Sequence, residues 1–367
     1  MTMQKPILSV TDLHVHFSLR GRSLHALRGV SLDVYQGESL AIVGESGSGK
    51  SVLNKNFMGL LDINGRISEG VIKYYTEDDY FFDSPYAGED ENGHYVDLAK
   101  FSCNNDWLDI RGSEICMIPQ DPLTSLNPLK RIGAQIGEAL YLHRGLKGKE
   151  QEAEVLRLLE DVRIDNPEKR MRQYPHELSG GMRQRVVIAI AMACNPKILI
   201  CDEPTTALDV TIQAQVLALL HELKSKYGLT IIFITHDLGV VANIAERVAV
   251  MYAGDIVELG LVDEIFYDPR HPYTWALLSS LPQLGQRGSE LYAIQGTPPN
   301  LFKDIQGDAF AARNPHALNI DHIEQPPYFE ASPTHKARTW LMDERAPKVE
   351  PPEVISKLKT LGGEGHE

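Results

Sequence analysis

The sequence has few cysteines and no long hydrophobic run. Its 367 residues include four cysteines and no CxxC pair, which argues against a disulfide framework or a zinc finger. The most apolar stretch, residues 186–201, is interrupted by Asn195, Pro196 and Lys197, so it falls short of the ~20 apolar residues that span a bilayer. We therefore expect reduced cysteines in a cytosolic chain that would work at a membrane only from outside the lipid.

Excess positive charge and an N-terminal leader are also missing. The formal net charge of −14 disfavours the phosphate backbone of nucleic acid as a partner, because that contact needs surplus Lys and Arg. The first residues, MTMQKPILSV, show no apolar stretch behind a basic start. We expect no nucleic-acid partner and no secretory signal.

The apolar pattern predicts an α/β fold. Residues 7–17 and 24–34 alternate apolar with polar and predict an antiparallel pair of strands. Continuous apolar runs at 198–202 and 229–235, with a crossover helix expected at 212–226, are typical of a mostly parallel sheet buried on both faces. A short strand at 39–43 runs into a glycine-rich loop and a helix expected at 52–61, and helical spacing recurs at 151–162.

Composition changes along the chain suggest its organisation. Residues 74–110 hold roughly ten acidic residues against one lysine, which we interpret as a solvated surface insertion. Past about residue 260 the chain becomes richer in Pro and His, and from 345 it is charged and contains glycine. We expect a main domain over residues 1–260, a smaller region over 261–340 and a loose tail over 341–367.

The glycine-rich loop fits the pattern GxxxxGK[ST], and its place between a strand and a helix is the one a phosphate-binding loop requires. Its backbone N–H groups would surround phosphate oxygens, Lys50 would reach the β- and γ-phosphates, and Ser51 would bind Mg²⁺. The residues expected to bind ATP here are Gly44, Glu45, Ser46, Gly47, Ser48, Gly49, Lys50, Ser51 and Val52.

Two carboxylates end the strand expected at 198–202. The carboxyl ends of parallel strands meet at one edge of a sheet, so Asp202 and Glu203 should lie beside the phosphate loop. Asp202 is expected to hold Mg²⁺, and Glu203 is placed to polarise the water that attacks the γ-phosphate.

The segment from Leu178 to Arg185, LSGGMRQR, resembles the signature motif of ABC-transporter ATPases. Further elements of that family stand around it: Gln120 resembles the Q-loop glutamine, Ala207, Leu208 and Asp209 resemble the D-loop, and His236 resembles the switch histidine. The resemblance implies an ABC-type P-loop ATPase core with an N-terminal antiparallel β part and a helical subdomain at about 121–185. It also implies that Gln120 helps to hold Mg²⁺, that Gln120 and His236 act in catalysis, and that Phe17 stacks on adenine.

In the family, the signature motif contacts ATP across a dimer. Ser179, Gly180, Gly181 and Met182 would therefore touch the ATP bound by a partner chain, so that two head-to-tail chains enclose two ATP molecules. From the residues alone, Ser179 with its glycines could equally be a helix cap.

Two further stretches resemble the ATPases of peptide and nickel importers: residues 120–128, QDPLTSLNP, and residues 271–280, HPYTWALLSS. The chain resembles the first member of the ATPase pair in that branch. The resemblance implies a second ATPase chain, two integral membrane permease subunits, an extracytoplasmic substrate-binding protein reached indirectly, and a peripheral place on the cytoplasmic face of the inner membrane.

The chain departs from this branch in its C-terminal region. Relatives commonly carry four cysteines there that suit an iron–sulfur cluster, whereas the matching positions here are Asp308, Asn314, Asp321 and Thr339. Such clusters need thiolates, so we expect no cluster. The acidic insertion and Pro119, which stands where an aromatic residue is common, are further departures.

These features favour an ATPase that drives import of peptides or similar small solutes. An oligosaccharide importer of the same branch is the first alternative, because other subunits select the cargo. A soluble ABC ATPase acting on ribosomes or DNA is a less favoured alternative, since the single core carries no coiled-coil or zinc insertion.

Overall fold

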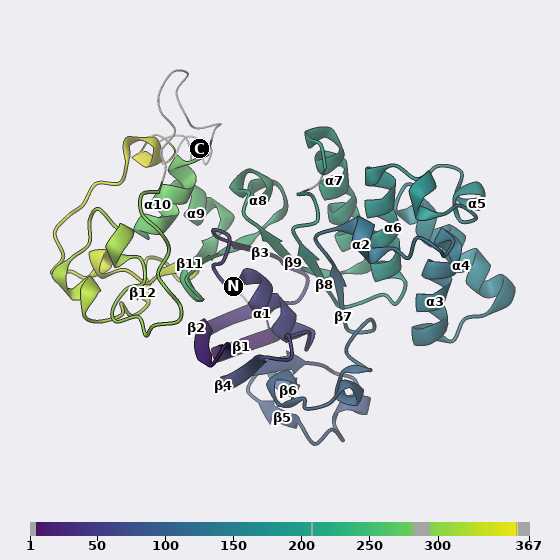
Figure 1. Ribbon diagram of the computed structural model, residues 1–367, viewed down its shortest axis with the longest axis horizontal. Coiled ribbons are helices and arrows are strands. Elements are labelled where there is room, and N and C mark those ends of the chain that lie inside the picture. Colours follow the sequence, from purple (N-terminus) through teal and green to yellow (C-terminus); the bar gives the residue numbers. More distant parts are fainter. Residues whose placement is uncertain (1–4, 207, 282–293, 357, 359–367) are drawn as a thin grey trace.

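A computed structural model describes residues 5–206, 208–281, 294–356 and residue 358 (Figure 1). The N-terminal part forms a five-stranded sheet in the order β2-β1-β4-β6-β5, in which every neighbouring pair is antiparallel. Its strands are β1 (Pro6–Leu19), β2 (Arg22–Tyr35), β4 (Gly65–Tyr75), β5 (Ala87–Asp90) and β6 (Gly93–Asp97).

A second, eight-stranded sheet forms the centre of the molecule in the order β12-β13-β11-β10-β3-β9-β8-β7. The five strands from β10 to β7 run parallel, and β11, β13 and β12 join antiparallel at one edge. The bounds are β3 (Ser39–Val43), β7 (Ile115–Ile118), β8 (Ile198–Asp202), β9 (Thr230–Thr235), β10 (Arg247–Tyr252), β11 (Asp255–Leu261), β12 (Phe329–Glu330) and β13 (Lys336–Ala337).

Helices from residues 122–192 gather at one end of the molecule, and the region after β11 lies at the other end (Figure 1). Within the described ranges, none of the helices is long and apolar enough to cross a membrane. The helices are α1 (Lys50–Phe57), α2 (Pro122–Ser125), α3 (Ile132–Arg144), α4 (Gly148–Asp161), α5 (Pro167–Arg170), α6 (Gly180–Met192), α7 (Val210–Tyr227), α8 (Leu238–Ile244), α9 (Val262–Tyr267) and α10 (Pro272–Ser279).

The expected elements agree closely with the structure. The alternating segments form the antiparallel pair β1 and β2, and the two apolar runs become β8 and β9 with α7 between them. The helix expected at 52–61 instead covers Lys50–Phe57, because it starts directly after the left-handed Gly49 and ends where the chain turns at Met58. The α/β fold class predicted from the sequence is confirmed.

Residues 74–110, interpreted from the sequence as a solvated surface insertion, have mostly exposed acidic side chains but also form regular structure with a buried side. This segment adds β5 and β6 to the antiparallel sheet, and Phe81, Val96 and Trp107 are buried in the same core cluster as β1 and β4. Most of its acidic residues are exposed, although Asp97 is buried. The apolar side chains of the segment are too widely spaced to show a period in the sequence, so their burial could not be predicted.

The region after residue 260 does not stand apart from the core. Strand β13 pairs with β11, and Tyr273 and Phe310 share a buried cluster with Tyr252 of β10. The tail also packs against this cluster, since Ile355 is only 2% exposed. The expectation of a loose tail is therefore wrong as far as its described residues extend; residues 359–367 lie outside them.

Candidate functional site

The phosphate loop connects β3 to α1 and depends on glycine at both ends. Gly44 has φ 152° and lies against β10, where a Cβ atom would come within 2.1 Å of the carbonyl oxygen of Met251. Gly49 has φ 105° and a Cβ there would meet the methyl group of Met251 at 2.9 Å. At Gly47 a Cβ would meet nothing within 4 Å, so the middle of the loop borders open space.

Lys50 is held against the loop itself. Its ammonium donates to the carbonyl oxygens of Gly44 at 2.7 Å and Glu45 at 2.9 Å, and the residue is only 5% exposed. Burial lowers the pKa of Lys50, while the carboxylates of Glu203 and Asp202 raise it. The lysine is therefore a fixed, partly desolvated donor at the start of α1.

Asp202 and Glu203 end β8 beside this loop, as the sequence predicted. Burial raises the pKa of Asp202, and a hydrogen bond from Asn54 on α1 opposes that rise. The backbone N–H of Glu203 donates to Ile234 of β9, and Glu203 adopts φ 45°. The side chains of Ser51, Asp202 and Gln120 offer a hydroxyl, a carboxylate and an amide oxygen, which are hard ligands of the kind that Mg²⁺ binds.

The carboxylate of Glu203 accepts hydrogen bonds from three neighbouring side chains. Its Oε1 accepts from Nδ1 of His236 at 3.0 Å, and its Oε2 accepts from Nε2 of Gln120 and from the hydroxyl of Thr206, each at 3.0 Å. Burial raises the pKa of Glu203, but the hydrogen bonds from His236 and Thr206 outweigh it and lower the pKa below its usual value. Glu203 is therefore ionised at neutral pH.

These side chains share one cleft of about 790 Å³. Its lining includes polar groups that could act on a phosphate. It also includes four apolar residues, Leu24, Ala26, Leu277 and Leu301. The lining residues that the sequence predicted are Gly44, Glu45, Ser46, Gly47, Gly49, Lys50, Ser51, Val52, Gln120, Glu203 and His236. Ser48 is not among the lining residues; it is buried within the loop, and its backbone N–H donates to the carbonyl oxygen of Glu45.

Phe17 is not among the residues that line this cleft, although its cross-strand partner Leu24 is, so its stacking on adenine stays a prediction. Phe17 is 8% exposed and belongs to the core cluster beneath β1, with its ring against Gly65 of β4. Alternation in β1 marks Phe17 as one of the inward-facing residues, but it does not say whether that face meets the core or the cleft.

The signature residues lie outside the cleft of their own chain. Ser179 caps α6 by accepting from the backbone N–H of Met182, and Ser179 and Gly180 are exposed. Gly181 lies against Ile212. Asp209 caps α7 by accepting from Thr211 and Ile212, and Ala207 lies outside the described residues. The cap interpretation of Ser179 is correct, and it leaves the first turn of α6 facing outward.

Sequence reasoning missed a set of contacts that tie the C-terminal region to the phosphate loop. The guanidinium of Arg313 donates twice to the carboxylate of Glu45, at 2.7 and 3.1 Å, and also to the hydroxyl of Tyr252 at 3.2 Å. The backbone N–H of Glu45 donates to the hydroxyl of Tyr273 at 2.8 Å. Arg313 and Tyr273 are each separated from Glu45 by more than 200 residues, so no local pattern could have indicated their contacts with the loop.

The four positions at which the family resemblance implied cysteines, namely Asp308, Asn314, Asp321 and Thr339, are buried, and their side chains accept hydrogen bonds from nearby backbone N–H groups. Three of them accept from the N–H two residues further on: Asp308 from Phe310, Asn314 from His316, and Thr339 from Leu341. Asp321 accepts from Leu318. These side chains all have local hydrogen-bond partners, and none of them is a thiolate. That the region binds no iron–sulfur cluster stays a prediction.

Comparison with known proteins agrees with this geometry. Residues 27–206 match the ABC transporter family, and residues 257–320 match the oligopeptide/dipeptide transporter C-terminal region. The chain is similar in fold to a dimeric ATP-binding cassette, MJ0796, in a post-hydrolysis state bound to ADP and phosphate (26% identity, TM-score 0.56, 70% of this chain and 98% of that one). It is also similar to cbiO1 of Clostridium perfringens, part of an ABC transporter complex (28% identity, TM-score 0.58, 72% and 92% covered).

Relatives match along nearly the whole length. The oligopeptide transport ATP-binding protein AmiE of Streptococcus pneumoniae is 54% identical over 98% of this chain and 96% of its own. OppD of Bacillus subtilis, named for oligopeptide transport, is 52% identical over 97% and 94%. DppD of Lactococcus lactis, named for dipeptide transport, is 51% identical over 96% and 95%. The chain therefore belongs to the ATP-binding, ATP-hydrolysing subunits of the oligopeptide and dipeptide branch of ABC transporters.

Proposed function

We propose that this chain powers an importer for peptides or similar small solutes across the cytoplasmic membrane, working from the cytoplasmic face. The observation that carries the proposal is the cleft in which Lys50, Gln120, Glu203 and His236 meet, in a chain with peptide-transport relatives along its full length. Cargo selection lies in other subunits, so an oligosaccharide importer of the same branch remains the first alternative.

In the proposed mechanism the phosphate loop binds ATP through its backbone N–H groups, while Lys50 leaves its carbonyl partners for the β- and γ-phosphates. The ionised Glu203 accepts a hydrogen bond from the attacking water and so orients it toward the γ-phosphate. His236 and Gln120 fix the Glu203 carboxylate from two sides. When bound by Ser51, Asp202 and Gln120, Mg²⁺ supplies charge neutralisation at the phosphate oxygens.

A second ATPase chain completes the site in this proposal. Ser179, Gly180, Gly181 and Met182 lie outside their own cleft, and next to Asp209 the side chain of Val210 is 82% exposed. The first turn of α6 thus has exposed donors that the phosphates of its own chain's site cannot reach, and they are free to contact an anion held by another chain. Head-to-tail pairing, with a paralogous chain as in the family, would bring the partner's signature to this chain's ATP.

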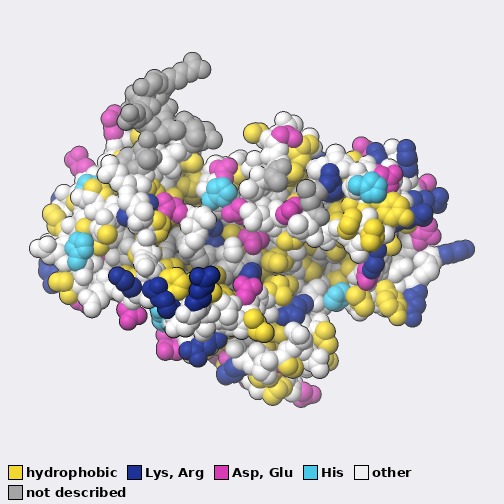
Figure 2. Space-filling view, in the orientation of Figure 1, with side chains coloured by type: hydrophobic (Ala, Val, Ile, Leu, Met, Phe, Trp, Pro, Cys, Tyr) yellow, Lys and Arg dark blue, Asp and Glu magenta, His cyan; other side chains and the backbone are white. Residues whose placement is uncertain are grey.

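We propose that a segment of a membrane permease subunit binds in a groove of about 340 Å³ beside Gln120. Hydrophobic side chains gather over the part of the molecule where α2 and α6 lie (Figures 1 and 2). The groove is lined mainly by apolar side chains, among them Met58, Met117, Pro119, Ala139, Val187 and Ile190. Pro119 lines the groove and directly precedes Gln120. A permease segment that pushes on Pro119 would therefore shift Gln120, whose side chain donates a hydrogen bond to Glu203.

The experiment is to tag a Glu203→Gln variant in its native cell, extract membranes with ATP and Mg²⁺, and identify the proteins that co-purify. The variant should bind ATP but not hydrolyse it, and so hold the closed assembly. We expect two integral membrane proteins and a second ATPase. The matched control is Glu222→Gln on the exposed side of α7, which should turn over ATP and retain less partner.

Recovery of the Glu203→Gln variant with ribosomes or nucleic acid alone would instead favour the soluble-ATPase alternative. Normal steady-state hydrolysis by that variant would overturn the assignment of Glu203 to the attacking water.

A further inference from the structure

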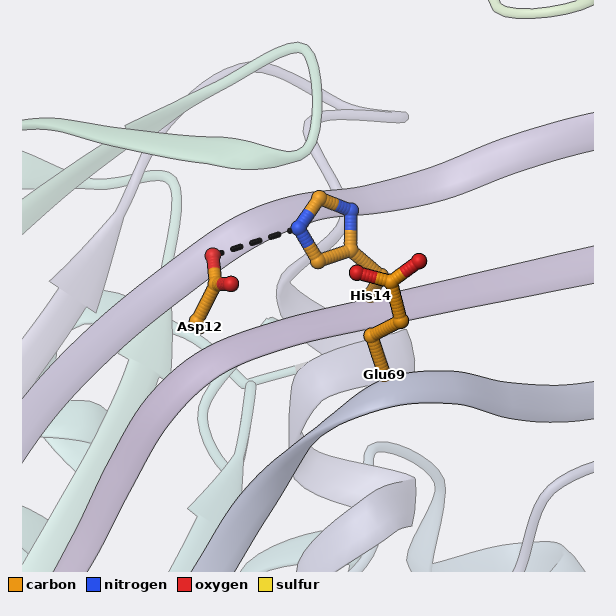
Figure 3. Close-up of side chains that lie close together, drawn as sticks. All are labelled: Asp12, His14 and Glu69. Atoms are coloured by element: carbon orange, nitrogen blue, oxygen red, sulfur yellow. Dashed lines mark hydrogen bonds and ion pairs between the residues drawn. The ribbon is translucent and has the colours of Figure 1, made fainter.

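A cluster of histidines and carboxylates lies on the antiparallel sheet, away from the groups that contact phosphate in the proposed mechanism. His14 of β1 lies between the carboxylates of Asp12 and Glu69 (Figure 3). One ligand atom from each of these residues lies within 4.8 Å of the other two. Nε2 of His14 is 3.2 Å from Oδ1 of Asp12, and Glu69 is the cross-strand neighbour of His14 on β4.

The strands are shaped to bring these side chains together. Strand β1 has a register shift between Val10 and Leu13, and Asp12 there has φ 49°. Gly70 of β4 makes this possible, because a Cβ atom there would lie 2.4 Å from the backbone oxygen of Asp12. Such irregularities commonly re-aim a side chain.

Gly29 of β2 keeps the space over the cluster open. A Cβ atom at Gly29 would lie 3.0 Å from Oδ1 of Asp12 and 3.3 Å from Nε2 of His14. Glycine inside a strand often marks the place where something approaches the backbone closely. Here it keeps clear the two atoms that would act as ligands.

The other nitrogen of His14 has a partner that fixes the ring. Nδ1 of His14 is 3.0 Å from Nε2 of His25 on β2. In the tautomer in which Nδ1–H of His14 donates to Nε2 of His25, Nε2 of His14 carries no proton and can bind a metal ion.

His25 is itself held in place. Its ring stacks on that of His16 at 4.0 Å, and Nδ1 of His16 is 2.9 Å from the hydroxyl of Ser68. A histidine that binds metal usually has its second ring nitrogen oriented by such a partner. The row His14, His25, His16 therefore presents one imidazole nitrogen with a defined direction.

We propose that Asp12, His14 and Glu69 bind a divalent transition metal ion of the Zn²⁺ class. One imidazole nitrogen and two carboxylate oxygens suit such an ion, with water in the remaining position. Ligand atoms around tetrahedral Zn²⁺ lie roughly 3.3 Å apart. Asp12 and Glu69 are exposed, and within the described part of the chain the carboxylate of Glu69 makes no hydrogen bond or ion pair, so both carboxylates can move toward the ion.

The test is equilibrium dialysis of the full-length chain against Zn²⁺ without nucleotide, with the melting temperature measured in parallel. We expect one ion per chain and a melting temperature that Zn²⁺ raises. His14→Gln should lose this ion, and His25→Phe, which keeps a ring in the stack, should weaken binding by about tenfold. The control is His221→Gln on the exposed side of α7, which should bind Zn²⁺ like the unaltered chain.

Unchanged Zn²⁺ binding by His14→Gln, or no bound ion in the unaltered chain, would overturn the proposal. If His14→Gln melts at a lower temperature without metal, Asp12→Asn and Glu69→Gln replace it. Each should weaken Zn²⁺ binding at least about tenfold, and full binding by both would equally contradict the site.

Discussion

At the scale of single residues, Glu203 combines a strained backbone with a fully engaged carboxylate. A φ of 45° costs a non-glycine residue roughly 1 kcal/mol or more, and such strain concentrates at functional sites. The sequence predicted the position of Glu203, because an apolar strand ending in two acids has a fixed place in an α/β sheet. It could not predict that Thr206 would share the carboxylate, since turn residues carry no period.

The buried carboxyl group of Asp308 makes the free energy of unfolding depend on pH, which provides a test of its burial. Burial raises the pKa of Asp308 to about 7, with the nearby Asp321 raising it further and Arg28 opposing. A raised carboxyl pKa means that the folded chain binds the proton more tightly than the unfolded chain. Its contribution to stability is fully present below about pH 4 and is lost as pH rises through about 7.

Asp308→Asn should therefore unfold with nearly the same free energy as the unaltered chain at pH 4.5 and be about 2 kcal/mol more stable at pH 8.5. The amide oxygen can still accept from Phe310, so the turn is kept. Urea unfolding at the two pH values measures the difference. Glu344→Gln at an exposed position is the control, and an equal effect of both variants would refute the burial argument.

At the scale of elements, contiguous patterns were predictable and distant pairings were not. Strands β3, β8 and β9 and helix α7 follow from runs of apolar residues, and the phosphate loop follows from its own glycines. The contacts of Glu45 with Arg313 and Tyr273 join residues 268 and 228 positions apart. Nothing in either segment indicates the other, so the link between the C-terminal region and the loop emerges only in the fold.

This link predicts that Arg313 is a positioning residue for ATP binding. Its side chain is 5% exposed and holds the Glu45 carboxylate with two hydrogen bonds, which fixes the first turn of the loop. Arg313→Ala should raise the KM for ATP by about tenfold, or about 1.4 kcal/mol, with a smaller change in kcat. Steady-state kinetics of the assembled transporter provide the measurement.

Arg345→Ala is the matched control, because it removes an exposed guanidinium whose one partner among the described residues is Asp343. A lower melting temperature with an unchanged KM for ATP would reduce Arg313 to a purely structural role. Partial recovery of KM in Arg313→Lys would support positioning by charge.

At the scale of the whole molecule, the acidic insertion and the C-terminal region both turned out to extend the sheets. Composition suggested solvated segments, but Phe81, Val96 and Trp107 in one and Tyr273, Phe310 and Ile355 in the other are buried. Net charge reports what faces water and not what lies beneath it. The adenine contact of Phe17 stays a prediction for a related reason, because alternation assigns a side chain to a face of the sheet without saying what covers that face.

The measurement that tests the central claim most directly is uptake of a labelled oligopeptide by cells in which Glu203→Gln replaces the unaltered chain. The account predicts that uptake is lost while the variant remains at the membrane and binds ATP, and that uptake of a free amino acid is unchanged. Oligopeptide uptake at the normal rate in cells that carry only this hydrolysis-deficient chain would contradict the claim that ATP hydrolysis in this cleft drives import.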